Sequence, residues 1–82
     1  MTAKQILAFA NEHARDSTEE LFRLEQSLIQ LGIDLAIKAE QEPYDTTLIK
    51  QIQDANEKLQ MVILLKIQRL ELFRQSSLKE VD

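Results

Sequence analysis

Apolar residues recur along this chain at steps of three and four, which is the spacing of one face of an α-helix. One series has the alternating steps of a coiled-coil seam and consists of Leu21, Leu24, Leu28, Leu31 and Leu35. A second series with similar steps consists of Leu48, Ile52, Ala55, Leu59, Val62 and Ile63. A shorter helical pattern precedes both, at Ile6, Leu7, Phe9, Ala10 and Ala14. The pattern predicts an all-α fold.

We expect three helices, near residues 3–14, 17–40 and 46–76. Ser17 and Glu20 stand at the spacing of a capping box, which favours a helix start at this point. No glycine or proline separates the first two helices, so a single continuous helix is an equally open alternative.

The loop around Pro43 divides the two long helices. A proline ring disfavours helical backbone at the preceding residue, so the second helix should stop near Glu40. Asp45 or Thr46 can cap the next helix. Two long helices joined by a short loop pack as an antiparallel hairpin, so we expect a single helical-hairpin domain over residues 1–82 with a short N-terminal helix.

Composition narrows the class of protein. The chain has 82 residues, 44% of them hydrophobic, and a formal net charge of −4, so it has no basic excess to attract nucleic acid. It contains no cysteine, which excludes disulfides and thiolate chemistry. Its longest apolar runs, residues 6–10 and 61–65, are too short for a signal peptide or a membrane span. We therefore expect a cytoplasmic protein without a membrane segment.

The two long helices carry more apolar surface than a hairpin can bury. Projected at 100° per residue, a second set lies about 150° from the leucine series; it consists of Phe22, Ile29, Ile33, Ala36 and Ile37. On the last helix the outward set is Met61, Leu64, Leu65 and Leu72. A small chain with such a surplus is expected to bind a protein partner or itself. The candidate partner-binding residues are Phe22, Ile29, Ile33, Met61, Leu65 and Leu72.

An alternative is that the first helix folds back over this surplus. Its apolar residues Ile6, Phe9 and Ala10 would then pack near Leu70 and Phe73. A helix of this length spans only about 20 Å, so it can cover only part of the apolar surface.

No pattern of catalytic or metal-ligating residues stands out. His13 lies near Glu12 and Asp16, but it is the only histidine, and a surface histidine explains it better than a metal ligand. The chain has no phosphate-binding loop and no nucleophile motif, so we expect neither enzymatic activity nor a cofactor. Two positions interrupt the apolar helical pattern. The ammonium group of Lys66 is expected to reach Glu19 or Glu20, or else an acidic residue of a partner. Gly32 either allows the backbone of a partner to approach closely or is a tolerated glycine within a helix.

The order of segments resembles a known family. A short N-terminal helix precedes Phe22–Leu31 (FRLEQSLIQL), a loop with Pro43-Tyr44, and Thr47–Glu57 (TLIKQIQDANE) leading into an apolar run. This is similar to the small type III secretion co-chaperones, the YscE/EscE/SsaE-like proteins. The resemblance implies a cytosolic helical hairpin that binds a tetratricopeptide-like chaperone, the pair keeping the needle subunit soluble before export. It implies no catalytic residue.

Two other interpretations remain open. The needle subunit itself is also a helical hairpin with a proline-containing loop, and Pro43, Asp45 and Leu48 fall in comparable places. This chain lacks the second loop proline of needle subunits, and its N-terminal half is apolar and capped where theirs is polar. The third interpretation is a homodimeric coiled-coil adaptor, and a homodimer of the isolated chain is compatible with the other two.

Overall fold

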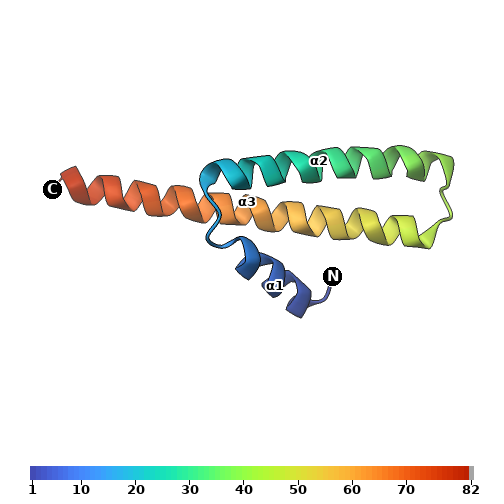
Figure 1. Ribbon diagram of the computed structural model, residues 1–82, viewed down its shortest axis with the longest axis horizontal. Helices are drawn as coiled ribbons and strands as arrows, with labels where there is room; N and C mark the ends of the chain where they lie inside the picture. Colours follow the sequence, from blue (N-terminus) through green and yellow to red (C-terminus); the bar gives the residue numbers. More distant parts are fainter. Residues whose placement is uncertain (82) are drawn as a thin grey trace.

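The computed structural model describes residues 1–81, with side chains through Ser76 (Figure 1). Its helices are α1 (Ala3–His13), α2 (Thr18–Gln41) and α3 (Thr46–Val81). No strand occurs in this part of the chain, which confirms the expected all-α class.

Side-chain caps set where the helices begin. The Thr2 hydroxyl accepts from the Gln5 amide at 3.2 Å and starts α1. The Ser17 hydroxyl accepts from the Glu20 amide at 3.1 Å and starts α2, so the first two helices are separate. Asp45 Oδ1 accepts from the amides of Thr47 and Leu48, at 3.0 and 3.2 Å, and starts α3. Each cap satisfies amide groups that the first turn leaves without a carbonyl partner.

The end of the last helix differs from the expectation. We expected α3 to fray near Ser76, and it continues to Val81. No glycine or proline follows Pro43, so nothing in the sequence breaks the helix before that point.

Helices α2 and α3 lie side by side, joined by the loop at one end, with α3 extending well beyond the start of α2 (Figure 1). The buried residues recur every seven positions on each helix. They are Leu21, Leu28 and Leu35 on α2, and Leu48, Ala55 and Val62 on α3. Leu21 and Val62 are fully buried, which makes them the best-packed point of the contact.

The contact between α2 and α3 differs in detail from the expected seam. Leu31 is 45% exposed, whereas the half-buried Ala39 packs against the buried cluster of Leu35, Leu48 and Ala55. Ile63 is 40% exposed although we placed it in the seam. The contact on α2 therefore centres on Leu28 and Leu35, and Leu31 lies to one side of it, in a groove that Asp54 and Lys58 also line.

Helix α1 folds back along α3 (Figure 1). Its N-terminal end lies at Asp54, and its C-terminal end lies at Arg69, whose Nη2 donates to the Ala14 carbonyl at 3.3 Å. In the alternative in which α1 covers the surplus, it packs near Leu70 and Phe73, but these are 65% and 73% exposed. Helix α1 does fold back, but it runs beside residues 54–69, before the part of α3 that overhangs α2.

The packing predicts a contrast between two leucines. Leu21→Ala should lower the free energy of unfolding by about 2–5 kcal/mol, because it opens a cavity in a fully buried site. Leu64→Ala removes the same atoms from a side chain that is 52% exposed and should cost about 0.5 kcal/mol or less. Urea unfolding followed by circular dichroism measures both, and equal losses would contradict the described packing.

Candidate functional site

Three of the six candidate residues lie on one uncovered side of the packed helices α2 and α3. Phe22, Ile29 and Ile33 are 53%, 38% and 50% exposed. Ile29 and Ile33 line a groove between α2 and α3, together with Gly32, Ala36, Ile52 and Leu59. We call this surface the open face; it consists of Phe22, Ile29, Gly32, Ile33 and Ala36 on α2, and Ile52, Leu59, Ile63 and Ile67 on α3.

None of the four α3 residues on the open face was among the candidates, and two of them are exposed. Ile63 and Ile67 are 40% and 50% exposed. They follow Leu59 at steps of four, so they continue the same side of α3 toward its C-terminal half. The steps of four from Leu59 were therefore a signal in the sequence for this side of α3, although the series expected to face α2 also included Ile63.

The open face carries no charge in its groove. The ten residues that line the groove are apolar or uncharged, the polar ones being Gln53 and Asn56. Such a surface offers hydrogen bonds at its edge and an apolar centre, which is the anatomy of a protein interface.

A charged pair marks one end of the open face. Lys66 Nζ donates to Glu25 Oε2 at 2.8 Å and lies 5.7 Å from the centre of the Phe22 ring. The expected pairing with Glu19 or Glu20 is wrong. Helical side chains lean toward the N-terminal end of their helix, and this direction along α3 carries the Lys66 side chain toward Glu25. Glu19 instead accepts from Arg23 at 2.7 Å.

The candidates Met61 and Leu65 lie elsewhere, toward α1. Both are half-buried. They share a face of α3 with Asp54, Lys58 and Arg69, and each of these three meets a group at or near α1. Helix α1 therefore lies over the Met61 side of α3 and leaves the open face uncovered.

The remaining candidate, Leu72, is 62% exposed on the part of α3 that extends beyond α2. With Leu70 and Phe73 it lines a second groove, which runs up to Thr18 and Leu21 at the start of α2. The structure thus distributes the six candidates over three places and brings only Phe22, Ile29 and Ile33 together.

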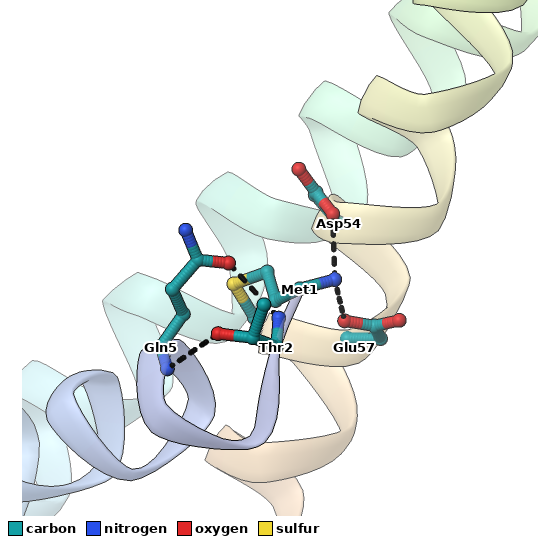
Figure 2. Close-up of polar contacts among 5 residues, drawn as sticks. All are labelled: Met1, Thr2, Gln5, Asp54 and Glu57. Carbon is teal, nitrogen blue, oxygen red and sulfur yellow. Dashed lines mark hydrogen bonds and ion pairs between the residues drawn. The ribbon is translucent and has the colours of Figure 1, made fainter.

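The N-terminal ammonium group fastens α1 to α3 (Figure 2). The Met1 nitrogen donates to Asp54 Oδ1 at 3.0 Å and to Glu57 Oε2 at 2.6 Å. The capping box between Thr2 and Gln5 fixes the turn that precedes the helix. Hydrogen bonds to Glu57 and Asp54 raise the pKa of the Met1 ammonium above its ordinary value of 8.0.

The only histidine, His13, contacts two neighbouring side chains. His13 Nδ1 lies 2.7 Å from Asp16 Oδ2, and its ring lies 4.7 Å from the Phe9 ring. Its side chain is 21% exposed, so it is more covered than the surface histidine we expected. Among the described residues, no three His, Cys, Asp or Glu side chains converge to hold a metal ion.

No family model matches this chain, and neither a curated protein nor a solved structure matches it. In addition, none of the described helices has the length and apolar content needed to cross a bilayer.

The raised pKa of Met1 predicts a pH dependence. The unfolded amine has the lower pKa, so its contribution to stability is complete below about pH 8 and is lost as pH rises through the folded-state pKa. Thermal melts of protein shown by mass spectrometry to retain Met1 should decline above about pH 8. Asp54→Asn with Glu57→Gln should flatten that decline. The control variant, Asp34→Asn with Glu40→Gln, changes two exposed residues and should leave the decline as it is. If the variant at Asp54 and Glu57 declined as steeply as the unaltered chain, the contact of these residues with Met1 would be contradicted.

Gly32 gives a second prediction. A Cβ at this position would meet nothing within 4 Å, so Gly32→Ala should raise the free energy of unfolding by about 0.5–1 kcal/mol through helix propensity alone. Ala36→Gly, one turn further on, should lower it by a similar amount. Chemical denaturation measures both, and a destabilising Gly32→Ala would show crowding that the structure does not contain.

Proposed function

We propose that this protein is a type III secretion co-chaperone, an antiparallel helical hairpin that binds a tetratricopeptide-like chaperone and helps to keep the needle subunit soluble in the cytoplasm. The observation that carries the proposal is the open face, an apolar surface on both long helices that α1 does not cover. A chaperone subunit must present such a surface before it meets its partner.

The chemistry of the open face suits a helical-repeat partner. Tetratricopeptide-like proteins stack helix pairs and so offer long, ridged helical surfaces. The spacing along α2 of three large side chains, Phe22, Ile29 and Ile33, suits them as anchors on such ridges. Each large aromatic or aliphatic side chain contributes about 1.5–3 kcal/mol to binding when it is fully buried. Met61 and Leu65 take part only if α1 moves aside, so the open face is the primary contact in this proposal.

The position of α1 favours a co-chaperone over a needle subunit. In the needle subunits that this chain also resembles, the N-terminal segment is polar. Here the N-terminal segment is capped by Thr2 and held on α3 by Asp54 and Glu57. The proposal includes no catalytic residue and no cofactor.

The co-chaperone proposal predicts that the purified chain forms no filaments. Light scattering and electron microscopy across a wide concentration range should show monomers or small oligomers only. Polymers that lengthen with concentration would instead support the needle-subunit interpretation.

The neighbouring residues Leu28 and Ile29 test the proposed contact. Leu28 is buried, so Leu28→Ala should cost about 2–5 kcal/mol of folding stability. Ile29→Ala should leave the melting temperature of the free chain nearly unchanged and weaken the chaperone complex by about 1–2 kcal/mol, which is about 5- to 30-fold in Kd.

The partner for this measurement comes from affinity capture in the native cell, followed by reconstitution of the purified pair. We expect a helical-repeat chaperone, with the needle subunit bound to it. A captured partner that is not a helical-repeat protein would contradict the co-chaperone proposal, and an Ile29→Ala variant that melts like Leu28→Ala but binds normally would contradict the proposed contact.

A further inference from the structure

We propose that the open face binds a second copy of this chain, so that two hairpins form a four-helix bundle around a two-fold axis. The inference rests on the shape, charge and size of this face and does not depend on the co-chaperone proposal.

Charge is the first argument. A two-fold contact brings the same patch of each copy together, so a charged patch would meet its own charges near the axis. The chain as a whole has a net charge of −4, yet the groove of the open face contains no charged residue. The charged side chains Asp54, Glu57 and Lys58 lie on the α1 side of α3 instead. Self-association through the groove therefore brings no like charges together, and the nearby Lys66 is paired with Glu25 of its own chain.

Size is the second argument. Helix α2 has 24 residues and is about 36 Å long. Two packed helices with axes about 9 Å apart present a face about 20 Å wide. A bundle formed along the whole of α2 would bury about 700 Å² on each copy, counting the rim around the open face, or about 1,400 Å² in total, which is within the range of stable specific interfaces.

The shape of the open face is the third argument. The half-buried Gly32 forms a low point, with Ala36 one turn further on and the larger Ile29 and Ile33 on either side. Open space lies above Gly32, since no atom comes within 4 Å of an added Cβ. An apolar side chain of the second copy can occupy this space, as a knob does in helix packing.

Sedimentation velocity of the full chain over micromolar to millimolar concentrations tests the proposal. We expect a monomer–dimer equilibrium whose Kd changes by less than about threefold between low and high salt, because the groove contributes no ion pair to the contact. Ile33→Glu places a charge on the open face and should weaken the dimer by at least about tenfold. The control Leu7→Glu changes an α1 side chain that is 63% exposed and should dimerise like the unaltered chain.

Crosslinking gives an independent readout. The chain has no cysteine, so Asn56→Cys introduces a single thiol in the groove, and Asp34→Cys introduces one on an exposed position of α2 outside the groove. Oxidation should give a disulfide-linked dimer from the first variant much faster than from the second. Circular dichroism of every variant checks that the helices are intact.

Three results would overturn the proposal. The unaltered chain could remain monomeric up to millimolar concentration, which would show that the open face does not bind a second copy. Ile33→Glu could dimerise normally while Leu7→Glu does not, which would place the contact on α1. Both cysteine variants could crosslink at the same rate, which would indicate collision without a specific interface.

Discussion

The packing of α2 against α3 is the interaction on which the rest of the molecule depends. Leu21, Leu28 and Leu35 recur every seven residues and meet a similar heptad series on α3, with Leu21 and Val62 completely buried. This contact uses one narrow stripe of each helix. The other apolar residues of both helices lie outside that stripe. They are therefore covered by α1, covered by another molecule, or left exposed to solvent.

Helix α1 covers only one side. It has 11 residues, so it is about 16 Å long and cannot wrap a hairpin more than twice that length. Its contacts, from the Met1 ammonium at Asp54 to the Ala14 carbonyl at Arg69, place it over Met61 and Leu65. The pair of helices α2 and α3 therefore has a covered side that carries charges and an open side whose groove carries none. In our account the open side receives the chaperone, and a second copy competes for the same surface.

Local patterns in the sequence predicted the helices better than the contacts between them. The caps at Ser17 and Asp45 and the break near Pro43 follow from neighbouring residues, and the helices begin within one residue of expectation. The docking position of α1 depends on groups more than fifty residues apart, which periodicity does not encode. The exposed position of Leu31 has a related cause, since how far this residue turns toward α3 depends on the opposite helix.

The most direct test of this account is whether α2 packs on α3 of the same chain. Nuclear Overhauser effects should connect the Leu35 methyl groups with those of Leu48 and Ala55, which form one buried cluster. In a mixture of labelled and unlabelled chains, an isotope-filtered spectrum separates contacts within a chain from contacts between chains. We predict that these effects appear within one chain and are absent from the intermolecular spectrum. Their appearance only between chains, or their absence from both spectra, would contradict the hairpin.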